Sequence, residues 1–158
     1  MPVSPIPEGY HALTPYLIVK DAAAALAFYA SALGATELFR MADPAGRIGH
    51  AEMRIGDSGF MLADEFPDVG AVAPVAGGGH AVSFLLYVPD VDAAIARAVQ
   101  AGCRVVKPVR DQFYGDRSGT VVDPFGHQWT IATHVEDVPP EEMQRRAEAM
   151  AKGAVADS

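Results

Sequence analysis

His50 and Glu52 lie two positions apart in residues 50–55, a run in which polar and apolar residues alternate. In a β-strand, side chains two positions apart share a face, so His50, Glu52 and Arg54 would point to the same side. That polar face must meet either solvent or a polar cavity. An imidazole beside a carboxylate can hydrogen-bond a small molecule or hold a divalent metal. We expect His50 and Glu52 to bind a ligand, and a metal-binding pair is the alternative.

A second segment, residues 111–118, combines charges, an amide and two aromatic rings. We interpret it as a loop between two strands. Arg117 could bind a substrate carboxylate or phosphonate through two hydrogen bonds, and Tyr114 could act as a general acid. Phe113 would line the same site. The competing interpretation is structural, with Asp116 and Arg117 forming an ion pair that folds the loop.

The only tryptophan, Trp129, follows Phe125 and His127 near the end of the patterned region. Its ring is suited to stacking on a planar ligand and equally suited to packing in a core. For Trp129 and Phe125 both interpretations stay open. His127 comes directly after a turn glycine, so we expect it to have a structural role in that turn.

The charge and hydropathy of the chain indicate which classes of partner it would not bind. The chain has 158 residues, with 12 Lys and Arg against 20 Asp and Glu, and its formal net charge is −8. Nucleic acids are bound through clustered Lys and Arg, which this sequence does not supply. No apolar run approaches the roughly 20 residues that cross a bilayer, and residues 1–10 lack the pattern of a signal peptide. We expect a cytoplasmic protein with no nucleic-acid or membrane partner.

Half of the residues are hydrophobic, which is sufficient for one sizeable core or two small ones. Cys103 is the single cysteine, so an intrachain disulfide and a thiolate metal cluster are excluded. It follows Gly102 at the start of an apolar run. We therefore expect a buried structural thiol rather than a nucleophile.

The elements that would position these residues occur twice along the chain. Residues 17–21 (LIVKD) are matched by residues 86–90 (LYVPD), 69 positions further on. Each run ends in an Asp that can cap a helix, and each is followed by an Ala-rich segment that stops at a Gly. Residues 47–49 (RIG) are matched by residues 117–119 (RSG) in the same order, 70 positions further on.

Each half is predicted to fold as strand, helix, strand, strand, strand. The predicted segments of the first half are Leu13–Val19, Ala22–Leu33 (helix), Thr36–Met41, Gly49–Ile55 and Gly59–Asp64. Those of the second half are Ala81–Val88, Val91–Ala101 (helix), Arg104–Val109, Thr120–Asp123 and Gln128–Thr133. The two modules would span about residues 10–65 and 80–134, with a linker over 66–79 and a final helix over about 139–152. In that helix, Met143, Ala147 and Met150 could pack on this chain or on a partner.

Paired βαβββ modules with these motifs resemble the vicinal oxygen chelate superfamily, which contains glyoxalases, bleomycin-resistance proteins and dioxygenases. The motifs are Val19-x-Asp21 before Phe28-Tyr29-x3-Leu33-Gly34, and Asp123-Pro124-x-Gly126 before the last strand. Residues 56–64, 111–117 and 123–129 are similar to the PhnB-like branch. The resemblance implies an α+β fold, with two tandem modules forming a curved mixed sheet around a cavity, and assembly as a homodimer.

In the metal-dependent members of this superfamily, side chains from the first and last strands of each module hold a divalent ion. The resemblance carries these positions to Thr14, Phe60 (or its neighbour Met61), Ser83 and Thr130. Hydroxyl and apolar side chains are poor substitutes for imidazole or carboxylate. We therefore expect no cofactor, with a divalent metal possible at His50 and Glu52. His11 and His80, at equivalent points of the two halves, are expected at the beginnings of strands.

These observations support two functions. The first is a glyoxalase- or bleomycin-resistance-like protein that binds a small organic molecule, with His50, Glu52, Phe113, Tyr114, Arg117 and Trp129 as ligand-binding candidates. The alternative is a metal-dependent lyase, isomerase or dioxygenase with relocated ligands. A third hypothesis is a metal-free catalyst that uses Tyr114 and Arg117.

Overall fold

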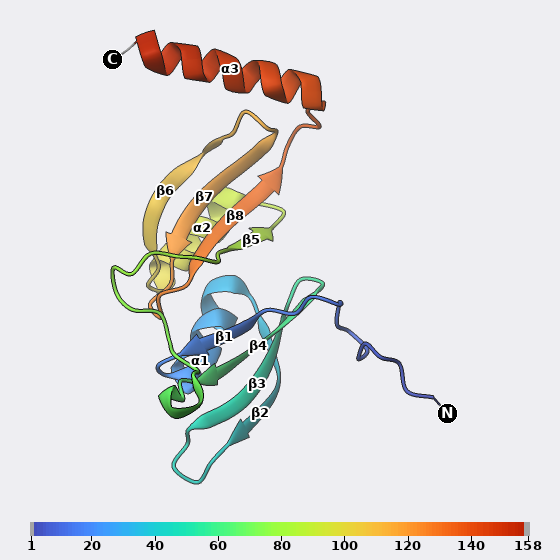
Figure 1. Ribbon diagram of the computed structural model, residues 1–158, viewed down its shortest axis with the longest axis vertical. Coiled ribbons are helices and arrows are strands. Elements are labelled where there is room, and N and C mark those ends of the chain that lie inside the picture. The colour runs from blue at the N-terminus through green and yellow to red at the C-terminus, as the bar shows by residue number, and fades with distance from the viewer. Residues whose placement is uncertain (1, 157–158) are drawn as a thin grey trace.

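The computed structural model describes residues 2–156, in which eight strands form two separate four-stranded mixed sheets (Figure 1). The first sheet contains β1 (Tyr16–Val19), β2 (Thr36–Ala42), β3 (Ile48–Ile55) and β4 (Ser58–Asp64), in the order β1-β4-β3-β2. The second contains β5 (Phe84–Tyr87), β6 (Arg104–Asp111), β7 (Asp116–Val122) and β8 (Gln128–His134), in the order β5-β8-β7-β6. The helices are α1 (Ala22–Leu33), α2 (Val91–Ala101), α3 (Pro140–Ala156) and the short 3-10 helix η1 (Pro67–Val69).

This architecture confirms the α+β class, the two tandem βαβββ modules and the C-terminal helix. The eight strands form two open sheets rather than one closed barrel, because β1 and β5 each pair with one neighbour only. β1 and β5 are shorter than predicted: they begin at Tyr16 and Phe84, where their four-residue parallel pairing with β4 and β8 begins. No helix within residues 2–156 has the length and apolar character needed to cross a membrane.

The repeat extends to the hydrogen bonds that begin each helix. The side chains of Asp21 and Asp90 each accept a hydrogen bond from a backbone N–H three residues ahead, at 3.0 and 3.1 Å. The first N–H of α1 donates to Asp64 at 2.8 Å, and the first N–H of α2 donates to Thr133 at 3.0 Å. Asp64 is the last residue of β4, and Thr133 is the last but one of β8. Each helix is therefore fixed both by its own cap and by the sheet that it covers.

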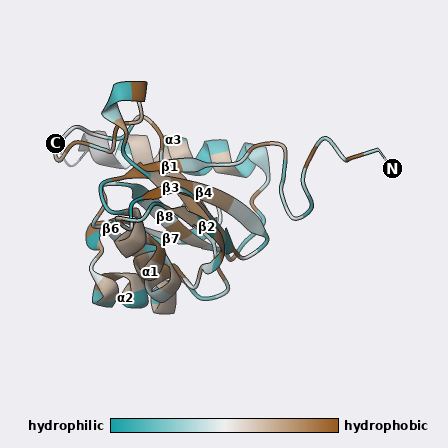
Figure 2. Ribbon diagram, turned by 90° about the horizontal axis from the view of Figure 1, so that it is seen from below, coloured by the Kyte–Doolittle hydropathy of each residue, from teal (hydrophilic) through white to brown (hydrophobic). Residues whose placement is uncertain are grey.

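The helices α1 and α2 pack against each other and lie on one side of the two sheets (Figure 2). Residues Ala51, Met53 and Ile55 of β3 point to this side and are buried. The opposite side of each sheet carries no helix of its own module, and we call it the open face. In β3 the open face carries His50 and Glu52, as the alternation of the sequence predicts.

A buried carboxylate joins the two modules. Asp123, only 4% exposed, accepts a hydrogen bond at 2.6 Å from the hydroxyl of Tyr29 in α1. It also accepts from the indole of Trp129 at 3.0 Å and from the backbone N–H groups of Phe125 and His127 at 2.9 and 3.0 Å. Burial, followed by the charge of Asp123, raises the pKa of Tyr29 well above 10, so the phenol keeps its proton and donates.

Other contacts complete this junction. The ring of His127 hydrogen-bonds the carbonyl oxygen of Ile18 in β1 at 3.0 Å, so its side chain contacts the other module rather than its own turn. The ring of Trp129 packs 4.9 Å from that of Phe84, centroid to centroid. Cys103 is buried as expected, and burial together with the charge of Asp123 raises the pKa of its thiol to about 12.

Candidate functional site

The open face of the first sheet carries a chain of three neighbouring polar side chains. The hydroxyl of Tyr16 lies 2.8 Å from Nδ1 of His50, and Nε2 of His50 lies 3.5 Å from Oε1 of Glu52. Burial and the charge of Glu52 raise the pKa of Tyr16, so its phenol is protonated and can either donate to or accept from Nδ1.

Apolar side chains surround this chain. Phe39 and Met41 of β2 lie opposite Glu52 and His50 in the strand register, and their side chains are 47% and 58% exposed. Tyr10, which precedes β1, has a buried hydroxyl with no hydrogen-bond partner among residues 2–156, and burial raises its pKa. The first open face is therefore a hydrogen-bonding centre inside an apolar rim.

The open face of the second sheet carries a small polar cavity of about 120 Å³. Ser118 and Thr120 of β7 line it and are each 4% exposed. The hydroxyls of Thr120 and Thr130 lie 2.9 Å apart. Lys107 and Arg110 of β6 line the same cavity. Tyr114 and Gln112 also line it, from the turn that follows β6.

A strand irregularity brings the two cations to the same face. Lys107 and Arg110 are three positions apart, which in a regular strand would place them on opposite faces. The register of β6 shifts between them, so that Lys107 pairs with Thr120 and Arg110 pairs with Ser118. Gly119 allows this: a Cβ there would lie 2.9 Å from Cγ2 of Val109 and 3.3 Å from the carbonyl oxygen of Lys107.

Half of the segment predicted as a loop over residues 111–118 belongs to strands. β6 runs to Asp111 and β7 begins at Asp116, so the turn between them is only residues 112–115. Gly115 allows this short turn, because its φ is +99° and a Cβ there would lie 2.0 Å from the carbonyl oxygen of Glu136.

Arg117 and Asp116 consequently point to opposite sides of the sheet. Arg117 donates to Asp92 of α2 at 2.8 Å and to Asp111 at 3.2 Å. Asp116 accepts from the hydroxyl of Tyr87 at 2.8 Å and contacts Nδ1 of His134 at 2.7 Å. The interpretation that Asp116 and Arg117 form an ion pair with each other is therefore wrong, because successive residues of a strand face opposite ways.

The C-terminal helix contacts the tip of this hairpin (Figure 1). Arg146 of α3 donates to the carbonyl oxygen of Phe113 at 3.1 Å and pairs with Glu136 at 2.8 Å. The ring of Phe113 meets that of Tyr114 edge-on, with centroids 5.2 Å apart. Phe113 is thus at the tip of the hairpin, beside the start of α3.

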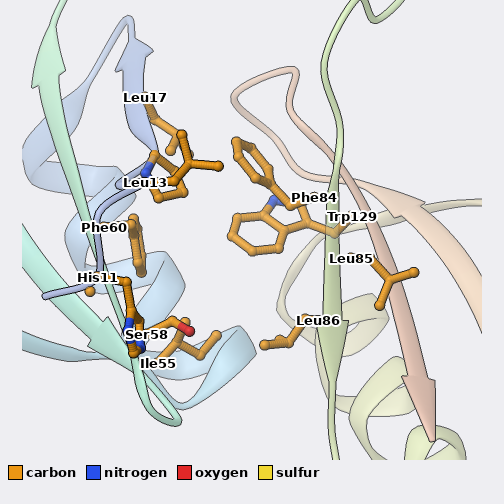
Figure 3. A pocket seen from close by; sticks show the side chains of 12 residues that line it. His11, Leu13, Leu17, Ile55, Ser58, Phe60, Phe84, Leu85, Leu86 and Trp129 are labelled. Atoms are coloured by element: carbon orange, nitrogen blue, oxygen red, sulfur yellow. The ribbon is translucent and has the colours of Figure 1, made fainter. Parts of the chain in front are cut away.

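An apolar pocket of about 220 Å³ lies between the two modules. In Figure 3, Phe84 and Trp129 point from the second module toward Leu13 and Leu17 of the first. His11 also lines this pocket, although we expected it only at the beginning of a strand. Trp129 is both a core residue, through its bond to Asp123, and part of the wall of the pocket.

The six ligand-binding candidates do not meet at one place in the chain. His50 and Glu52 lie together on the first open face, and Tyr114 lines the polar cavity on the second. Trp129 lines the pocket between the modules. Arg117 is bound to the carboxylates of Asp92 and Asp111 on the helix side.

The sequence reasoning assigned no site role to Lys107, Arg110, Gly119 or Thr120, which all line the polar cavity. The available signal was Pro108, since a proline inside a strand pattern indicates an edge or a bulge.

At the positions to which the family resemblance assigns metal ligands, the side chains make contacts with other protein groups. Thr14 and Ser83 precede β1 and β5, and the hydroxyl of Thr14 donates to the carbonyl oxygen of His11. Phe60 is 3% exposed, and its ring packs against Trp129. Thr130 is bonded to Thr120. Across residues 2–156, no group of three or more His, Cys, Asp or Glu side chains could together hold a metal ion.

The sequence from residue 10 to residue 131 matches the family model of the Glyoxalase/Bleomycin resistance protein/Dioxygenase superfamily. The chain belongs to this superfamily. A relative from Mycobacterium bovis, an uncharacterized protein, is 41% identical over 145 residues, covering 90% of this chain and 95% of its own. The resemblance drawn from the sequence motifs is therefore confirmed.

Solved structures of superfamily members share the fold. TioX from Micromonospora sp. ML1 has a TM-score of 0.63 and 28% identity, over 79% of this chain and 99% of its own. The PhnB protein from Bacillus cereus has a TM-score of 0.60 over 78% of this chain and 99% of its own. Its 16% identity makes it a likeness of fold alone.

Alanine substitutions at Gly119 and at its counterpart in the first module test whether the close approach of β6 requires a glycine. Replacing Gly119→Ala should lower the free energy of unfolding by about 1–3 kcal/mol, because the new Cβ forces β6 away. Gly49→Ala, at the matching position 70 residues earlier, should change it by less than about 1 kcal/mol, since the nearest atom to a Cβ there is 4.0 Å away. Urea unfolding measures both, and equal effects would contradict the tight approach at Gly119.

Proposed function

We propose that the protein binds a small organic molecule on the open faces of its sheets and that it does so without a resident metal. The observation that carries this proposal is the chain formed by Tyr16, His50 and Glu52, which is inside an apolar rim rather than on a uniformly polar surface. Donors and acceptors fixed in place among apolar side chains are typical of small-molecule sites. Membership of the superfamily is consistent with such a site.

The chemistry of the expected metal positions supports metal-free binding. Thr14, Ser83 and Thr130 offer only neutral hydroxyls, and Phe60 offers an aromatic ring that packs in the core. These groups do not fit the imidazole and carboxylate ligands that zinc, nickel or iron require.

One observation favours the alternative of a metal-dependent lyase, isomerase or dioxygenase. His50 and Glu52 are on the same face, with Nε2 and Oε1 3.5 Å apart, and both could bind one ion. The pair would need further ligands. Within the part of the chain that the structure describes, the third neighbour is the phenol of Tyr16, which is held by Nδ1 of His50.

We further propose that a second copy of the chain covers the open faces. Both faces expose large apolar side chains, with Met41 at 58%, Leu85 at 51% and Tyr87 at 59%. Large apolar side chains gathered on the open side of a sheet are expected at a surface that a partner covers. A homodimer would enclose the ligand between modules of the two chains.

The dimer can be tested with two matched substitutions. In sedimentation velocity, the protein should have twice the 16.7 kDa mass of one chain. Phe39→Lys should shift the mass toward 16.7 kDa, because it places an unpaired charge in the interface. Val99→Lys, on α2 and 42% exposed against 47% for Phe39, should leave the dimer intact. A monomeric parent protein would contradict the proposal.

Binding is tested with 1-naphthamide, a neutral aromatic probe, followed by amide chemical shifts in nuclear magnetic resonance. The shifts should saturate and should be largest at Tyr16, His50 and Glu52. His50→Asn should weaken binding about three- to tenfold through the lost hydrogen bond, whereas His80→Asn should leave it unchanged. Shifts confined to the helix side, or no saturation, would overturn the proposed function.

A further inference from the structure

We infer that the polar cavity on the second open face is a subsite for an oxyanion, so that the ligand carries a carboxylate, phosphonate or sulfonate group. This rests on the proposed function, because it specifies one end of the molecule that the open faces would bind. With a volume of about 120 Å³, the cavity suits a single anionic group rather than a whole organic molecule. Its lining consists of two cations, hydroxyls, an amide and a glycine, with no carboxylate.

The two cations have no partner within the part of the chain that the structure describes. Among residues 2–156, neither Lys107 nor Arg110 forms an ion pair, and neither side chain donates a hydrogen bond to another residue. In contrast, Arg117, Arg145 and Arg146 are each paired with carboxylates. Exposed lysines and arginines are ordinary, but here the register shift of β6 turns two of them toward the same cavity. Their charges are therefore available to a ligand.

The floor of the cavity supplies hydroxyl donors. Ser118 is 4% exposed, yet its hydroxyl has no hydrogen bond within residues 2–156. This hydroxyl opens on the cavity, so it is free to donate to a ligand there. Thr120 and Thr130 share one hydrogen bond, so one of the two hydroxyls keeps its proton for a ligand. Cations above hydroxyl donors form a complementary site for negatively charged oxygen atoms.

The neighbouring carboxylates do not neutralise this site. Asp116 lies on the same face as Ser118 but already bonds Tyr87 and His134. Asp111, beside Arg110 in β6, is paired with Arg117. The chain as a whole has a net charge of −8, so a positive cavity is contrary to the overall balance. The overall composition of an acidic protein does not explain why two cations gather at one cavity.

The test compares 1-naphthoate and 1-naphthylphosphonate with 1-naphthamide, which has the same rings and no charge. By isothermal titration calorimetry at low ionic strength, the better anion should bind about tenfold more tightly than the amide. Added salt should weaken the binding of the anion and leave the binding of the amide unchanged. A preference for the carboxylate or for the phosphonate identifies the anion class, and either preference supports the subsite.

Substitutions of residues that line the cavity test whether the anion binds there. Lys107→Gln and Arg110→Gln should each weaken anion binding about three- to fivefold and leave amide binding unchanged. Arg104→Gln, in the same strand but outside the cavity lining, is the matched control and should have no effect. If the amide binds as tightly as both anions, or if Arg104→Gln acts like Arg110→Gln, the inference is wrong while the proposed function stands. If no probe binds, the proposed function itself fails.

Discussion

The buried carboxylate of Asp123 is the interaction on which the arrangement of the two modules depends. A charge at 4% exposure is tolerable only when its oxygens are bonded, and Asp123 has four donors. One of them, Tyr29, comes from the other module. The repeat is broken at this point: position 53, 70 residues before Asp123, is the buried and apolar Met53. An asymmetric bond between Tyr29 and Asp123 therefore helps to fix two otherwise similar modules, together with the bond from His127 to Ile18.

This junction determines where the functional surfaces lie. Because α1 and α2 meet at the junction, both sheets turn their other sides outward as open faces. The first open face carries the carboxylate and imidazole of Glu52 and His50, and the second carries the cations Lys107 and Arg110. The two faces thus differ in charge although their strands match. We propose that a ligand uses this difference, with polar groups at one face and an anionic group at the other.

Much of the fold could be predicted from the sequence, since caps, glycine stops and a repeat are local signals. Strand alternation likewise placed His50 and Glu52 on one face. The role of Arg117 could not be derived in this way, because its direction depends on the hairpin register with Asp111. The partnership of Lys107 and Arg110 depends on a bulge, which reverses the alternation on which sequence reasoning relies. The junction at Asp123 was missed because its partner Tyr29 is 94 residues away.

The central claim is that the open faces bind an organic ligand without a metal. The most direct measurement is a calorimetric titration of the metal-stripped protein with Zn²⁺, Ni²⁺ and Fe²⁺, the last under anaerobic conditions. The hydroxyl and apolar groups at the expected ligand positions predict no one-to-one complex with any of these ions. A one-to-one complex that disappears when His50 is replaced by Asn would contradict the account and establish His50 as a metal ligand.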